Sequence, residues 1–185
     1  MNAMARLSDG FLERGASATR LEAFVDATFA FAVTLLVISL NTIPSSIAGM
    51  LDALKGVPAF AASFAQIMMF WSAHAIWSRR FGLDDQPSQR LSLLLMFLVL
   101  VYVYPLKIVF GALFHWISGG WMPQVAAIGT LHDLKMMFAM YGLAFGTLSL
   151  CLAALNRQAL RARIEPPLEP AERAATRGEI MRWVY

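Results

Sequence analysis

One carboxylate in an otherwise apolar stretch is the side chain with the clearest capacity for chemistry. Between Ala23 and Leu40 the only charged residue is Asp26. A stretch of this length crosses the hydrocarbon core of a bilayer, where an unpaired charge costs several kcal/mol. Asp26 therefore indicates a role in function or assembly, and its partner is expected on a neighbouring span.

A histidine on the next apolar stretch lies at a matching depth. Asp26 follows Arg20 by six residues, which places it roughly 9 Å into its helix. His74 precedes Arg79 by five residues, roughly 8 Å from the same face if the second helix runs the other way. Other polar-capable neighbours are Trp71, Gln89, Arg90 and Ser92. The spacing predicts contact between Asp26 and His74, either as a structural hydrogen-bond clamp or as a proton-sensitive element, since histidine titrates near neutral pH.

The remaining reactive side chains do not form a catalytic or metal-binding pattern. His74, His115 and His132 are spread over two faces of the predicted membrane domain, which disfavours a three-histidine metal site. The pair Asp84 and Asp85 has no neighbouring histidine, and no glycine-rich phosphate loop is present. We therefore expect neither an enzyme nor a cofactor or metal.

The elements that position these residues are membrane helices. Of the 185 residues, 58% are hydrophobic and 15% are charged, against about 25% charged in a soluble domain. The sequence predicts an all-α, polytopic helical membrane protein with spans over about 21–40, 57–77, 91–114 and 136–155. Its organisation is an N-terminal arm (1–19), a four-helix transmembrane domain (20–155) and a basic tail (156–185). Gly142 and Gly146, four residues apart, form a close-packing motif for membrane helices.

Basic residues predict the orientation. They concentrate in the arm, in the second connection and in the tail, whereas the first and third connections hold only Lys55 and Lys135. The positive-inside rule then places both termini in the cytoplasm, in the cell (inner) membrane. The small net charge of +3 and the placement of basic residues between apolar runs do not favour a nucleic-acid partner.

A second face of the first span carries an apolar stripe with one hydroxyl. At about 100° per residue, four residues cluster roughly 100° round from Asp26, with Leu35 beside them. They are Ala27, Phe31, Thr34 and Ile38. Such a stripe can line a narrow pore that closes by dewetting, or it can pack against another helix. Periodicity does not separate the two.

Two motifs resemble a known family. The run Arg20-x-x-x-Phe24-Val25-Asp26, followed by Thr34-Leu35-Leu36-Val37, resembles the R-x-x-x-F-S-D signature that opens the transmembrane protein 175 family, the bacterial relatives of the lysosomal potassium channel. Trp71-x-x-His74 is similar to the W-x-x-H element of that family. The likeness covers the first three spans by motif and the fourth by hydropathy.

The resemblance implies a six-helix subunit, assembled in bacteria as a homotetramer, with potassium ions as the permeant and no carbonyl filter. By position, the pore-lining residues implied are Phe31, Thr34, Leu35 and Ile38. The residues implied to hold the first helix in place, as a polar clamp, are Arg20, Phe24, Asp26, Trp71 and His74.

Three features depart from the family pattern. Val25 replaces the signature serine, and Phe31 stands where the family usually has isoleucine or leucine. Only four spans are visible, because the sequence stops at Tyr185, where a fifth helix is expected to begin. The chain is thus expected to be a fragment or a shortened form, with the tail holding the start of that helix.

Three functional hypotheses remain open at this point. The first is a potassium-permeable cation channel made of several copies. The second is a non-conducting membrane scaffold or regulatory protein, for which four spans and a glycine interface are sufficient. The third is a proton-coupled carrier that uses Asp26 and His74.

Overall fold

The computed structural model describes residues 5–38 and 45–185, without the side chain of Ile38. The regular elements of these residues are α-helices, apart from one isolated bridge between Arg6 and Leu12. The helices are α1 (Arg20–Ile38), α2 (Ile47–Leu54), α3 (Val57–Phe81), α4 (Gln86–Ile117), α5 (Leu131–Arg161) and α6 (Pro170–Val184). The prediction of an all-α chain is confirmed.

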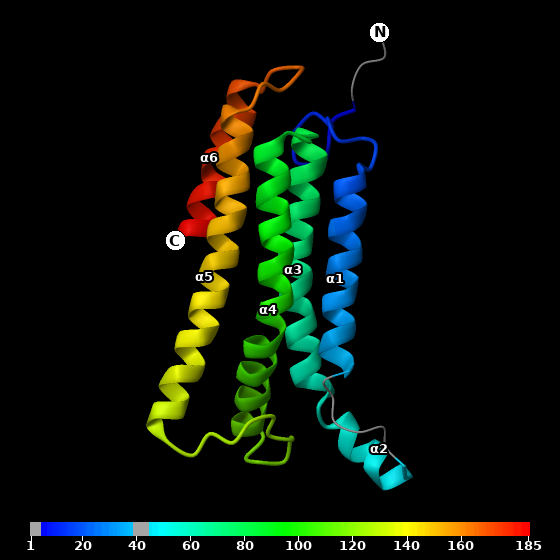
Figure 1. Cartoon of the computed structure of the whole chain (residues 1–185), viewed down its shortest axis with the longest axis vertical. Helices are drawn as coiled ribbons and strands as arrows, with labels where there is room; N and C mark the ends of the chain where they lie inside the picture. Colours follow the sequence, from blue (N-terminus) through cyan, green and yellow to red (C-terminus); the bar gives the residue numbers. More distant parts are fainter. Residues whose placement is uncertain (1–4, 39–44) are drawn as a thin grey trace.

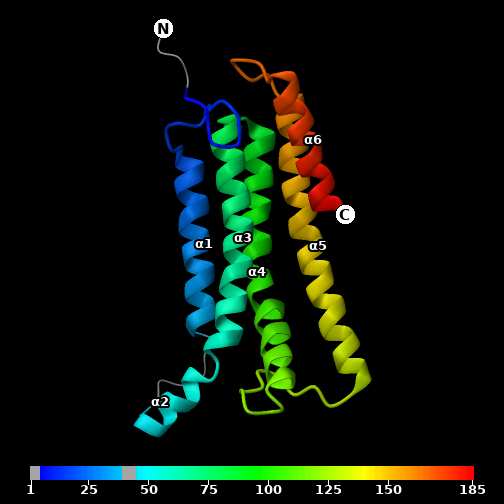
Figure 2. The same ribbon diagram turned by 180° about the vertical axis from the view of Figure 1, so that it is seen from behind.

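The long helices run side by side along one axis (Figures 1 and 2). Within the described residues, α3, α4 and α5 are long and apolar enough to cross a membrane. Helix α1 packs against α3 and α4 in the same bundle, although it carries Arg20, Glu22 and Asp26 near its start. The second predicted span ends later than expected, at Phe81, and the third and fourth extend at both ends.

Local sequence explains where the helices start and stop. Thr130 caps α5 by accepting a hydrogen bond from the amide of Asp133, whose carboxylate bonds back to Thr130. Gly82 caps the C-terminal end of α3 and adopts a left-handed conformation (φ 57°) that is open to glycine without strain. The short helix α2 is capped by Ser46 and projects away from the bundle (Figure 1).

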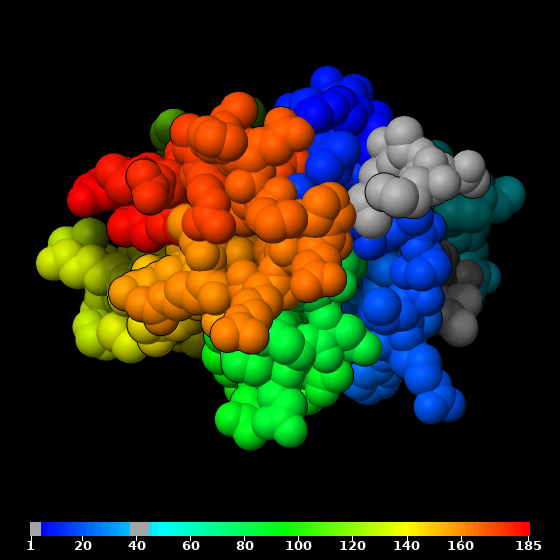
Figure 3. Space-filling model, turned by 90° about the horizontal axis from the view of Figure 1, so that it is seen from above, coloured from blue at the N-terminus to red at the C-terminus, as the bar shows by residue number. Residues whose placement is uncertain are grey.

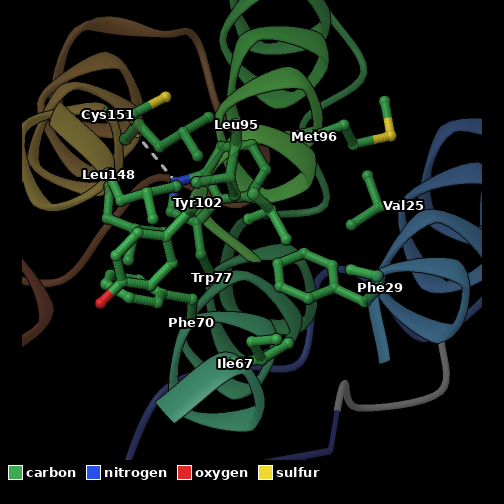
Figure 4. Packing of buried hydrophobic residues seen from close by; sticks show 14 of the residues in the cluster. Val25, Phe29, Ile67, Phe70, Trp77, Leu95, Met96, Tyr102, Leu148 and Cys151 are labelled. Atoms are coloured by element: carbon green, nitrogen blue, oxygen red, sulfur yellow. Dashed lines mark hydrogen bonds between the residues drawn. The ribbon is translucent and has the colours of Figure 1, made fainter. Parts of the chain in front are cut away.

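One apolar core joins the four long helices (Figure 4). Val25 and Phe29 of α1 point toward α3 and α4 in this view, and Phe70 of α3 packs edge-on against Tyr102 of α4. On the α5 side, the indole N–H of Trp77 donates a hydrogen bond of 3.0 Å to the carbonyl of Leu155. These contacts fix α1 against one side of the α3–α4 pair and α5 against another.

The predicted tail contains a packed helix. After α5 ends, the chain turns at residues 162–169, and α6 runs back beside α5 (Figure 1). Trp183 near its end stacks on Phe70 of α3, with ring centroids 5.8 Å apart. The N-terminal arm, the α3–α4 connection and the α5–α6 connection meet at one end of the bundle (Figure 3).

Candidate functional site

The carboxylate of Asp26 binds the indole of Trp71. The Nε1 of Trp71 in α3 donates to Oδ1 of Asp26 in α1 over 2.8 Å. A tryptophan N–H can only donate, and a carboxylate can only accept, so the two groups are complementary. The expected direct pair of Asp26 and His74 does not form, because Asp26 accepts from Trp71, one turn away from His74, and His74 is bonded to Ser92.

His74 forms its hydrogen bond with α4 and not with α1. Its Nε2 lies 3.0 Å from the hydroxyl of Ser92, and the histidine is 2% exposed. The ring also lies against Trp77, at 5.6 Å between centroids. Ser92 was expected among the polar neighbours of this pair, and it is the residue that satisfies the imidazole.

A further polar contact between α1 and α4 was missed from the sequence. The hydroxyl of Thr28 lies 3.1 Å from the sulfur of Met96 and also donates to the carbonyl of Phe24. The only sequence signal was a hydroxyl in an apolar helix one turn from the signature. Together with Trp71 and Asp26, this contact ties α1 to both of its neighbours.

The other two residues of the expected polar clamp lie on the outside of the subunit. Arg20 is exposed at the start of α1, and Phe24 is 58% exposed. Neither side chain packs α1 into the core of its own chain. Val25, which departs from the signature, is fully buried, so it adds apolar packing where the signature has a hydroxyl.

The two faces of α1 differ sharply in burial. The residues that face the bundle recur at helical spacing and are at most 1% exposed: Val25, Phe29, Ala32 and Leu36. On the opposite side Ala27, Phe31 and Thr34 are exposed, and Leu35 is half-buried between the two. The predicted stripe is therefore uncovered within one subunit, while the side chain of Ile38 lies outside the described residues.

The polar group on the uncovered face has its partner within the helix. The hydroxyl of Thr34 donates to the carbonyl of Ala30 over 3.0 Å. Phe31 is 54% exposed and is the largest side chain of the stripe. The face thus presents apolar surface with a satisfied hydroxyl.

The glycine motif of α5 does not mediate close packing within the subunit. A Cβ added at Gly142 or at Gly146 would meet no atom within 4 Å. Leu143, between the two, is 71% exposed, so this side of α5 is open as well. Among the described residues no group of three or more His, Cys, Asp or Glu side chains is placed to hold a metal ion.

Comparison with known proteins gives the family. The model of the family described as endosomal/lysosomal potassium channel TMEM175 matches residues 20–105. A crystal structure of a variant of the potassium channel MtTMEM175, in complex with a nanobody–MBP fusion, matches 97% of this chain and 79% of that one at a TM-score of 0.85 and 30% identity. This chain belongs to the TMEM175 family.

A protein of Marivirga tractuosa named potassium channel is 36% identical to this chain over 146 residues. The match covers 74% of this chain and 57% of the relative, so the chain spans little more than half of that protein's length. The family match begins at Arg20 and contains α1, α3 and most of α4. It therefore includes every residue of the Asp26–Trp71 and His74–Ser92 contacts. Because α3, α4 and α5 are each long and apolar enough to cross a membrane, the chain is a multi-pass membrane protein of a channel family.

Proposed function

We propose that several copies of this chain form a potassium-permeable cation channel whose pore is lined by α1. The observation that carries the proposal is the uncovered stripe of Ala27, Phe31 and Thr34, which lies opposite the packed face of the same helix. A helix that is tightly packed on one side and bare on the other is suited to face a common axis. The description of the matched relatives as potassium channels supports the same function.

The chemistry of the stripe suits a hydrophobic constriction. Apolar rings control ions by their width and by whether water wets the pore, without removing the hydration shell through carbonyl groups. Phe31 is the bulkiest exposed side chain of the stripe. We therefore place the narrowest part of such a pore, among the residues that the structure describes, at Phe31. Leu35 borders the stripe and is proposed to line the pore beside Thr34. Ile38 is proposed to line the pore one turn beyond Thr34, at the end of the stripe.

The proposed assembly is a homotetramer in the cell (inner) membrane, with the bilayer around it. Its cytoplasmic side is the end at which the arm, the α3–α4 connection and the α5–α6 connection meet. Arg14, Arg79, Arg80 and Arg163 all belong to segments at that end, in accord with the positive-inside rule. The glycines of α5, where an added Cβ would meet no atom of the subunit within 4 Å, offer a surface for contact between subunits.

The test is potassium flux into vesicles that contain the purified oligomer. Phe31→Ala widens the proposed constriction and should change the flux, whereas Phe97→Ala, which truncates an exposed phenylalanine of α4 outside the proposed stripe, should not. A well-folded oligomer that conducts no potassium under any gradient would contradict the proposal and favour a scaffold. The carrier hypothesis needs a proton path through Asp26 and His74, but these residues bind different partners.

A further inference from the structure

The N-terminal arm (residues 5–19) is fastened to the bundle by one buried guanidinium. Arg14 is 2% exposed in its side chain and uses all its nitrogens. Its Nε donates to the carbonyl of Pro166, and Nη1 donates to the carbonyls of Leu12 and Arg80. Nη2 reaches the carbonyl of Pro167 at 3.4 Å. One side chain therefore contacts the arm, the end of α3 and the α5–α6 connection.

The charge of Arg14 is balanced by a buried carboxylate in the first turn of α6. Oε1 and Oε2 of Glu172 lie 3.0 and 2.8 Å from the two terminal nitrogens, a bidentate pair. Glu172 also accepts hydrogen bonds from the backbone amides of Leu12 and Glu169. Burial alone would raise the pKa of Glu172, but these hydrogen bonds and Arg14 hold it at about 2. The carboxylate is thus ionised at any physiological pH.

The arm reaches the start of α1 over a short distance. Directly after Arg14, the amide of Gly15 bonds to the carbonyl of Arg79, and a Cβ at Gly15 would collide with the carbonyl oxygen of Ser78. Only Ala16, Ser17 and Ala18 separate this docked glycine from Thr19, which caps α1 through the amide of Glu22 at 3.1 Å. The anchor at Arg14 is therefore only a few residues from the first turn of α1.

We propose that Arg14 and Glu172 are positioning residues for the conducting helix: their buried pair fixes where the cytoplasmic end of α1 stands relative to α3 and α6. The inference rests on the proposed function, because it assigns the pair a role in conduction through α1. A lysine at position 14 keeps the charge but cannot reproduce the planar fork that holds a carboxylate and several carbonyls together. The requirement is therefore for the geometry of arginine as well as its charge.

The arm offers a matched control. Arg6 also pairs with the α6 end of the chain, through Glu169 at 2.6 Å, but its side chain is 52% exposed and that of Glu169 43%. An exposed pair contributes little to the position of either element. Neutral substitutions of Arg6 and of Arg14 thus compare an exposed and a buried ion pair, both of which join the arm to the start of α6.

The experiment measures position and conduction separately in the full chain. Spin labels at Ala23→Cys on α1 and Ala174→Cys on α6, both exposed sites, report the distance between the two helices. Labelled chain is diluted with unlabelled chain, so that distances within one subunit dominate. The single native cysteine, Cys151, is buried, and the unmutated chain shows its background labelling. Potassium flux is measured on the same variants without labels.

We expect a narrow distribution of the distance between the two labels in the parent chain and in Arg6→Gln. The distribution should be shifted or broadened in Glu172→Gln and Arg14→Gln, and should change by an intermediate amount in Arg14→Lys. Flux should fall in the same order, by about tenfold for the buried variants, which is within the range for residues in contact. If the neutral variants do not fold, Arg14→Lys against Arg6→Gln decides.

The two proposals fail in different ways. An unchanged distance in Arg14→Lys and Glu172→Gln, or a change equal to that of Arg6→Gln, would overturn the positioning role whatever the flux. A parent chain that does not conduct, but shows the predicted distances, would contradict the channel and leave the pair as a link that positions α1 in a non-conducting protein.

Discussion

The two faces of α1 have opposite surroundings although they belong to one helix. Val25, Phe29 and Leu36 are at most 1% exposed against α3 and α4, while Phe31 on the other side is 54% exposed. Both faces are apolar, so hydrophobicity alone does not distinguish them. The comparison indicates that the packed face stabilises the subunit, and that the uncovered face remains available for the proposed assembly and conduction.

The largest expected effect is on the packed face. Phe29→Ala leaves a cavity between α1 and α3, and it should lower the free energy of unfolding by about 3 kcal/mol. At Phe31, which is 54% exposed within the subunit, the same truncation removes much less buried surface and should cost less than about 1 kcal/mol. Thermal unfolding of the two variants in one detergent measures the difference. Equal losses would mean that the two faces are not distinct.

The buried pair of Arg14 and Glu172 should contribute a similar amount to stability, with a characteristic pH dependence. The carboxylate of Glu172 has a pKa of about 2 in the folded chain against 4.5 as its ordinary value, so its stabilisation is present above pH 4.5 and is lost as pH falls toward 2. Arg14 faces it directly, and Arg6 lies farther away. Glu172→Gln should therefore cost about 3 kcal/mol at pH 7 and much less near pH 3.

That pH dependence is measured by unfolding parent and variant at both pH values. A difference between them that stays constant from pH 7 to pH 3 would exclude the ion pair as its source. The measurement also sharpens the comparison of faces, because it shows whether α1 is held by its packed face alone or also by the arm that precedes its first turn.

A smaller effect is expected from the hydrogen bond between α1 and α3. Trp71→Phe removes the donor to Asp26 and should cost about 1 kcal/mol, since Asp26 is exposed within the subunit and keeps access to other donors. His74→Ala should cost more, because it empties a buried site and leaves Ser92 without its partner. If the order of these two losses is reversed, Asp26 is more isolated than the subunit structure indicates.

The smallest effect on the subunit is expected at the glycines of α5. Gly142→Ala places a methyl group in open space and should change subunit stability by less than about 0.5 kcal/mol. If that face contacts another subunit, the same change should reduce the oligomer, as measured by light scattering in detergent. A loss of subunit stability without a change of assembly would contradict the open position of Gly142.

The sequence was enough to predict how far along its helix each polar residue lies. It predicted only in part which neighbouring helix each side chain points to. Counting residues placed Asp26 and His74 at one level, and both do lie near the same end of the bundle. It did not show that α1 meets the Trp71 side of α3 while His74 turns to Ser92 on α4, because that depends on how three helices are arranged. The stripe of α1 followed from periodicity, but its exposure required the packed neighbours.

The arm and the tail were beyond sequence reasoning for a different reason. Arg14 and Glu172 are 158 positions apart, and each resembles an ordinary charge of a polar segment. Their contact depends on the turn after α5 and on the docking of Gly15 against α3, and neither leaves a periodic signal. The glycine spacing of α5 was visible, but which surface it serves depends on packing partners that a single sequence does not reveal.

The central claim is that the uncovered face of α1 borders a water-filled ion path, and thiol modification tests it most directly. Thr34→Cys places a nearly isosteric thiol on that face, and Phe97→Cys places one at an exposed site of α4 outside the stripe. A charged, water-soluble thiol reagent should block potassium flux through Thr34→Cys and leave flux through Phe97→Cys and the unmutated chain unchanged. Flux through Thr34→Cys that persists after full exposure to the reagent, with the thiol still unmodified, would show that this face meets lipid or protein, and would contradict the account.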